Sequence, residues 1–237
     1  MSAWCDLRHR DNRKELLDMD IPDTETPASL EVALFPIPSM VVFPHTIVPL
    51  HVFEPRYRQM VNDCVDKHRM IAICHTEKEI RSAPKMQEPA DALKNNQATY
   101  KPYEIFSAGY CDIDEVLDDG RIYLRIYVEK RLRMISEVQT LPYRIANAVE
   151  IVDADADGAE ELKLAVNHQL KKITRGRDER LDKMLSSDTW ISQSPYEFSF
   201  KLFQFIRFDA DVMQHLLETT STRERLEITQ SLLNQVG

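Results

Sequence analysis

The sequence predicts an α+β protein, in which a small antiparallel, β-barrel-like domain with one helix precedes a helical bundle. Residues 31–152 contain short apolar segments with the alternation of strands, whereas residues 158–237 show helical spacing and two capping boxes. An acidic stretch, VDADADGAEE at 152–161, separates the two parts. Residues 1–30 are polar and predict an N-terminal arm.

Prolines divide the apolar stretch of the first domain into elements. The predicted strands 33–38 and 47–53 both contain proline. Because proline has no backbone donor, it is expected in an edge strand or at the end of a strand. Pro55 fits the first position of a helix over 55–67, because that position needs no amide donor. The prolines therefore end strands and begin a helix.

The remainder of the first domain is predicted to form strands around one hairpin. A strand over 70–76 leads into a polar connection, 77–104, which is long for a compact domain. An Asp-Gly pair before strand 121–134 is typical of a two-residue hairpin turn. A last strand, 142–152, completes the sheet.

Strand 121–134 alternates between an apolar face and a polar face. The polar face is predicted to carry Arg121, Tyr123, Arg125, Tyr127, Glu129, Arg131 and Arg133. A two-residue turn would put Asp118 opposite Arg121, and by the same register Asp114 opposite Arg125. Cross-strand charge pairs of this kind stabilise a sheet by about 0.2–1 kcal/mol each.

Capping residues mark the helices of the second part. Ser194 and Ser221 each begin a capping box, and Asp209 is placed to cap a helix between them. Helices near 160–174 and 178–187 precede these. We expect a bundle of about five helices.

Composition excludes several classes of function. The net charge of −9 and the pI near 5.3 disfavour nucleic acid as a partner, because phosphate binding needs an excess of Lys and Arg. No apolar run approaches the roughly 18 residues that span a membrane, and the charged N-terminus lacks a signal-peptide core. A cytoplasmic protein is expected.

Motifs for catalysis and for metals or cofactors are missing from the sequence. The chain has five glycines and neither GxxxxGK[ST] nor GxSxG, so we predict no nucleotide cofactor and no enzyme activity. Its four cysteines lack a CxxC pair and its seven histidines lack metal-ligand spacing. Asp153 begins a DADADG segment similar to an EF-hand, but the twelfth position is Leu164, which favours an acidic linker.

The segment LFPIPSMVVFPHTIVPLHVFEPRYRQMV resembles the opening of the Lon protease N-terminal domain, also called the Lon substrate-binding domain. Asp119, Gly120 and Arg121 match the hairpin turn of that family. Further matches are Arg131, Gln214, Leu217, Glu218, Arg225 and Leu226. His45 departs from the pattern, since the family often has glycine there. The connection 77–104 resembles an insertion relative to the family pattern.

The resemblance implies a PUA-like barrel and a recognition role. It implies a stand-alone member without the ATPase and protease domains of Lon, binding unfolded or exposed apolar polypeptide segments. Such a module would be an adaptor or regulator of proteolysis, with protease components among its partners.

Two groups of residues are candidate binding sites. The proline-flanked loop after the first strand is predicted to bind polypeptide if its apolar side chains are exposed, and to join the core if it folds inward. Its candidate residues are Met40, Val42, Phe43 and His45. The alternative is a small-molecule or RNA site on the polar face of strand 121–134. Its residues are Arg121, Tyr123, Arg125 and Tyr127.

The pair Glu54 and Arg56, on either side of Pro55, is interpreted as structural. A carboxylate at a helix N-terminus interacts favourably with the helix dipole, and an ion pair between the two side chains would fix the turn.

Overall fold

The computed structural model describes residues 28–84, 89–155, 158–176 and 178–236. Most of the predicted arm, residues 1–27, lies outside them. The strands are β1 (Leu30–Pro36), β2 (Ile47–Val52), β3 (Ile71–Cys74), β4 (Thr76–Arg81), β5 (Thr99–Pro102), β6 (Ile105–Val116), β7 (Ile122–Gln139) and β8 (Ile145–Glu150). The helices are α1 (Pro55–Asp66), α2 (Glu160–Thr174), α3 (Glu179–Leu185), α4 (Asp188–Ile191), α5 (Pro195–Lys201), α6 (Ala210–Glu218) and α7 (Thr222–Val236), with 3₁₀ turns η1 (Pro89–Leu93) and η2 (Leu202–Gln204).

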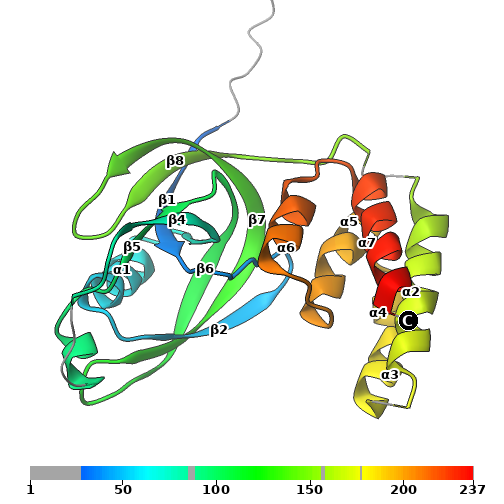
Figure 1. Ribbon diagram of the computed structural model, residues 1–237, viewed down its shortest axis with the longest axis horizontal. Coiled ribbons are helices and arrows are strands. Elements are labelled where there is room, and N and C mark those ends of the chain that lie inside the picture. Colours follow the sequence, from blue (N-terminus) through cyan, green and yellow to red (C-terminus); the bar gives the residue numbers. More distant parts are fainter. Residues whose placement is uncertain (1–27, 85–88, 156–157, 177, 237) are drawn as a thin grey trace, which may run out of the picture.

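The predicted α+β class is confirmed, with strands in one half of the molecule and helices α2–α7 in the other (Figure 1). Six strands pair in the order β2-β7-β6-β3-β1-β8, and β8 pairs again with β7, which closes the sheet. The β1–β3 pair is parallel, unlike the predicted antiparallel arrangement, because β2 and α1 lie between these strands in sequence and return the chain. The other pairs of this sheet are antiparallel.

Proline placement in the strands follows the prediction. Pro36 ends β1, and Pro49 lies in β2, which pairs with β7 alone and forms an edge. Pro55 begins α1, whose buried residues are Tyr57, Met60, Val61 and Cys64. These side chains pack against one face of the sheet together with residues of β7 such as Leu124 and Ile126.

The hairpin between β6 and β7 has a different register from the predicted one. The structure pairs Val116 with Ile122 and Asp112 with Arg125, because the loop is longer than two residues and Asp114 is an extra residue at a bulge. Gly120 adopts a φ of 84°, which favours glycine at the turn. The Asp114 carboxylate still forms an ion pair with Arg125, at 2.6 Å.

A second irregularity in this pair corrects the predicted faces of β7. Ala108 pairs with Lys130 but Gly109 pairs with Val128, so Glu129 is an extra residue on β7. The backbones approach so closely that a Cβ on Gly109 would lie 1.8 Å from the Tyr127 carbonyl oxygen. Since side chains alternate, the extra residue moves Arg131 to the opposite face from the predicted one, where it is buried.

Part of the connection 77–104 is structured. β4 and β5 form a small sheet, and η1 lies between them. The Asn96 side chain accepts a hydrogen bond from the Arg56 backbone N–H at 3.1 Å, which caps the N-terminus of α1 from a distant part of the chain. The connection therefore supplies the cap that Glu54, the N-cap residue, does not provide.

Three helices of the helical part, α5, α6 and α7, begin where their capping residues predict. Ser194 accepts a hydrogen bond from the Glu197 N–H, Ser221 from the Glu224 N–H, and Asp209 from the Asp211 N–H. The described chain contains six helices after the sheet rather than about five, and α4 is the additional one. Whether residues 31–152 and 158–237 are separate subdomains stays a prediction.

Candidate functional site

The loop between β1 and β2 places its predicted binding residues in different surroundings. Val42 and Phe43 are buried, with 7% and 2% of their surface exposed, so of the two alternatives these side chains follow the one in which the loop folds into the core. Phe43 stacks on Phe203 with ring centroids 4.3 Å apart, and packs in the apolar cluster of the helices. The helices therefore cover the part of the loop around Phe43.

His45, in the same loop, has a left-handed backbone. Its φ is 64°, and its N–H donates to the Val128 carbonyl at 2.8 Å. A left-handed backbone favours glycine, which is the residue that the resembled family often has at this position. The ring packs edge-on against Tyr196, and partial burial lowers the pKa of His45.

Met40 is half-buried and lines an apolar groove of about 460 Å³. The groove lies between the end of β1, strand β2, the start of α1 and the segment before β5. Its apolar lining includes Ile37, Pro38, Leu50, Phe53, Tyr57 and Ala98. Burial raises the pKa of Tyr57 to about 12. The groove presents bulky apolar side chains at an opening to solvent.

One wall of the groove is fixed by the ion pair predicted between Glu54 and Arg56, which is present at 2.9 Å. Glu54 also accepts a hydrogen bond from the Gln97 N–H at 2.9 Å. Arg56 donates to the Ala98 carbonyl at 2.7 Å and to the Thr99 hydroxyl at 3.1 Å. The start of α1 is thereby joined to the segment that leads into β5.

A second cavity, of about 340 Å³, adjoins the groove. Its lining shares Arg56, Tyr57 and Tyr100 with the groove. Its other lining residues are mostly polar and include Arg81, Ser82, Asn96, Thr99 and Arg144. Sequence reasoning missed this cavity, because half of its wall comes from the connection 77–104, whose local sequence carries no motif.

The alternative binding face on β7 is internally paired. Arg121 forms an ion pair with Asp119 rather than with Asp118, at 2.8 Å, and Arg125 pairs with Asp114. Tyr123 stacks on His51 with ring centroids 4.5 Å apart. Tyr127, half-buried, lies beside Arg125, whose guanidinium is 5.9 Å from the ring centroid. These contacts support the interpretation of an ordinary solvent-facing sheet.

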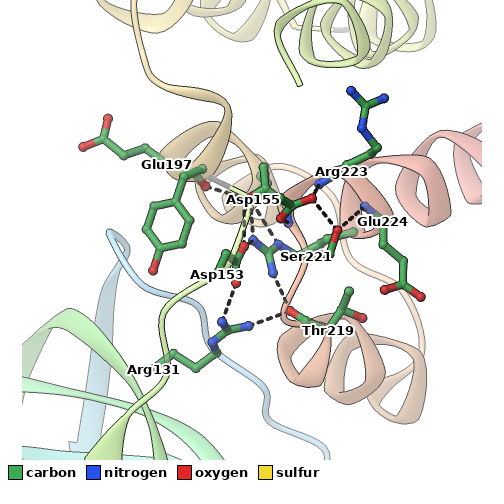
Figure 2. Close-up of polar contacts among 12 residues, drawn as sticks. Arg131, Asp153, Asp155, Glu197, Thr219, Ser221, Arg223 and Glu224 are labelled. Atoms are coloured by element: carbon green, nitrogen blue, oxygen red, sulfur yellow. Dashed lines mark hydrogen bonds and ion pairs between the residues drawn. The ribbon is translucent and has the colours of Figure 1, made fainter. Parts of the chain in front are cut away.

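A buried ionic network joins the sheet to the helices (Figure 2). Asp153 forms ion pairs with Arg131, at 2.5 Å, and with Arg225, and all three side chains are fully buried. Arg131 and Arg225 also donate to the Thr219 carbonyl, which ends α6. Asp153 therefore anchors the chain between β8 and α2, a role that the prediction of an acidic linker missed.

The DADADG segment has a structural use at its second aspartate as well. Asp155 accepts hydrogen bonds from the Ser221 hydroxyl and the Thr222 N–H, both at 2.7 Å, at the start of α7 (Figure 2). Asp157 lies outside the described residues. Across the described ranges, no three His, Cys, Asp or Glu side chains are grouped so as to hold a metal ion.

The cysteines in the described part of the chain are free and at least half-buried. Cys64 and Cys74 are buried and Cys111 is half-buried, all three as free thiols. Burial raises the pKa of Cys64 to about 12 and that of Cys111 to about 11, which makes both poor nucleophiles near pH 7. Helices long and apolar enough to cross a membrane do not occur among the described residues.

Comparisons with known proteins point to one family. Residues 31–235 match the family model described as ATP-dependent protease La (LON) substrate-binding domain. Lon protease 1 of Herpetosiphon aurantiacus is 25% identical over 140 residues, which cover 56% of this chain and 15% of that protein. The chain thus spans less than a sixth of the length of this curated relative.

Two solved structures share the fold. The N-terminal domain of the Mycobacterium avium complex Lon protease superposes with a TM-score of 0.62 at 13% identity, covering 86% of this chain and 98% of that domain. A Lon N-terminal domain protein from Xanthomonas campestris has a TM-score of 0.54 at 18% identity, covering 86% of this chain and 97% of that one.

Proposed function

Because the chain belongs to the Lon substrate-binding domain family, we propose that it is a non-enzymatic module that binds unfolded or exposed apolar segments of other polypeptides. The observation that carries the proposal is the apolar groove bounded by β1, β2 and α1. Its volume of about 460 Å³ lies within the range of roughly 300–1,000 Å³ that is usual for ligand pockets. Met40 is the predicted binding residue that lines it.

The groove suits a short extended segment with bulky apolar side chains. Its lining offers aromatic and aliphatic surfaces at Leu50, Phe53 and Tyr57, and prolines at Pro36 and Pro38, which supply apolar surface without a backbone donor. Burying two or three apolar side chains there is favourable, but the loss of translational and side-chain freedom offsets much of it. We therefore expect binding in the micromolar range.

We further propose that this recognition serves proteolysis, with the chain acting as an adaptor or regulator and protease components as its partners. The family match supports this role. An assay with a purified Lon-type protease and an unfolded substrate tests it, because an adaptor or regulator changes the rate of degradation. An unchanged rate over a wide range of concentrations would contradict this part.

Polypeptide binding is tested by fluorescence anisotropy of a labelled, permanently unfolded polypeptide. Met40→Asp, at the groove, should weaken binding by about tenfold or more, because a charge would be desolvated. Ile135→Asp is the matched control, since Ile135 is 59% exposed on β7 and does not line the groove. The melting temperature of each variant verifies folding. Equal affinities for both variants and the wild type would reject the groove as the site.

A further inference from the structure

The cavity beside the groove has an unusual charge. Its described lining residues include three arginines, Arg56, Arg81 and Arg144, and neither aspartate nor glutamate. The chain as a whole has a net charge of −9, so a cavity of this kind does not follow from composition. The local charge favours an anionic group of a ligand.

Two of the three arginines form ion pairs with glutamates that do not line the cavity. Arg56 pairs with Glu54, and Arg144 pairs with Glu137 and donates to the Tyr100 carbonyl at 2.9 Å. Arg81, at the end of β4, is exposed and makes neither a hydrogen bond nor an ion pair through its side chain with any part of the chain that the structure describes. Its guanidinium therefore remains available to a ligand.

Neutral donors accompany Arg81 in the lining. The Asn96 side-chain oxygen accepts from the Arg56 N–H, which leaves the Asn96 amino group to donate elsewhere. The Thr99 hydroxyl oxygen accepts from Arg56, which leaves its own proton to donate. A carboxylate accepts several hydrogen bonds at once, and bonds from a guanidinium are the strongest of these. The three donors together match a carboxylate.

We propose that this cavity binds a carboxylate of the same polypeptide whose apolar side chains occupy the groove, an inference that rests on the proposed function. The two cavities share Arg56, Tyr57 and Tyr100, so one extended segment can fill both. The carboxylate is either an acidic side chain that follows the apolar residues or the C-terminal carboxylate of the chain. The protein therefore prefers polypeptide segments that carry a carboxylate beside their apolar side chains over segments that lack one.

The test is a cycle of protein variants and labelled peptides measured by fluorescence anisotropy. One apolar peptide is made in three forms: with a free C-terminus, with an amidated C-terminus, and amidated with one glutamate after the apolar residues. Each is titrated with the wild type, Arg81→Ala and Arg133→Ala. Arg133 is an exposed arginine on β7 that does not line the cavity, so its variant controls for net charge.

The wild type should bind at least one carboxylate form about fivefold more tightly than the amidated peptide, as expected for an exposed ion pair. Arg81→Ala should abolish this preference without changing the affinity for the amidated peptide, and Arg133→Ala should retain it. The form that shows the preference identifies the source of the carboxylate.

Three results would overturn the proposal. Equal binding of all three peptides by the wild type would reject the carboxylate and leave the apolar groove standing. A preference that persists in Arg81→Ala would reject this cavity. Failure of every peptide to bind would reject the carboxylate site together with the proposed function.

Discussion

Arg131 of β7 and Asp153, which follows β8, form an ion pair between fully buried side chains. Asp153 also pairs with Arg225 of α7, so one carboxylate joins the sheet to the last helix (Figure 2). Two guanidinium groups and one carboxylate leave a net positive charge in the interior. Burial lowers the pKa of Arg225, against the stabilising effect of Asp153. The Thr219 and Leu217 carbonyls and the Ser199 hydroxyl accept further hydrogen bonds from the two arginines.

Removal of the shared carboxylate should destabilise the protein strongly. Asp153→Ala leaves two buried arginines without a counter-charge, and we expect a loss of about 3–5 kcal/mol in the free energy of unfolding. Urea denaturation measures it. Asp155→Ala, two residues further on, is the control and should cost only about 1 kcal/mol as a lost helix cap. Equal losses for the two variants would contradict the anchoring role of Asp153.

The cap formed by Asp155 should make stability depend on acidic pH. Desolvation raises the pKa of Asp155, but hydrogen bonds from the Ser221 hydroxyl and the Thr222 and Arg223 amides outweigh it and hold the pKa below its ordinary value of 3.8. The folded state therefore binds this proton less readily than the unfolded state. The stabilisation is present above the unfolded pKa and is lost as pH falls through the folded pKa.

Comparison with Asp155→Asn isolates this contribution. The difference in unfolding free energy between the wild type and the variant should be constant above about pH 5 and should shrink below about pH 4. Urea titrations from pH 6 to pH 2 measure the difference. A difference that grows on acidification would show that the sign of the linkage is wrong.

The left-handed backbone at His45 should favour glycine over alanine. Both His45→Gly and His45→Ala lose the ring contact with Tyr196, so their difference reports the cost of a Cβ at a φ of 64°. We expect His45→Gly to be more stable than His45→Ala by about 1 kcal/mol. Thermal denaturation of the two variants provides the measurement, and the reverse order would contradict the assigned conformation.

Phe43 and Met40 should respond differently to truncation. Phe43→Ala removes a ring from the cluster with Phe200 and Phe203 and should cost about 3–5 kcal/mol. Met40→Ala removes a half-exposed side chain and should cost about 1 kcal/mol or less while it weakens peptide binding. Denaturation and anisotropy together separate the two effects. A Phe43→Ala protein as stable as the wild type would contradict the burial of this residue.

Glu54 should control the order of the groove wall. Glu54→Gln keeps the shape of the side chain but leaves the Arg56 guanidinium without a counter-charge, with an expected loss of about 1–3 kcal/mol. The Gln97 amide should exchange its hydrogen faster, because its acceptor is weakened. Glu115→Gln, on the exposed end of β6, is the matched control. Unchanged exchange at Gln97 would argue against this coupling.

The sequence by itself determined the elements whose signals are local. Pro55 begins α1, and the serines and the aspartate at three helix starts accept the hydrogen bonds that capping predicts. A cap or an apolar stripe depends on residues within one or two turns, so a single sequence contains the whole signal. The Glu54–Arg56 pair belongs to the same class, because two residues of separation suffice to form it.

Only the tertiary structure decided which side chains are buried and what they contact. One extra residue at the β7 bulge exchanged the faces of the strand and buried Arg131, whose partner Asp153 lies 22 residues away. Phe43 is covered by η2 and α5, which follow it by more than 150 residues. The polar cavity exists because β4, β5 and the start of α1 meet. Burial and ion pairing depend on distances between segments remote in sequence, which local patterns do not encode.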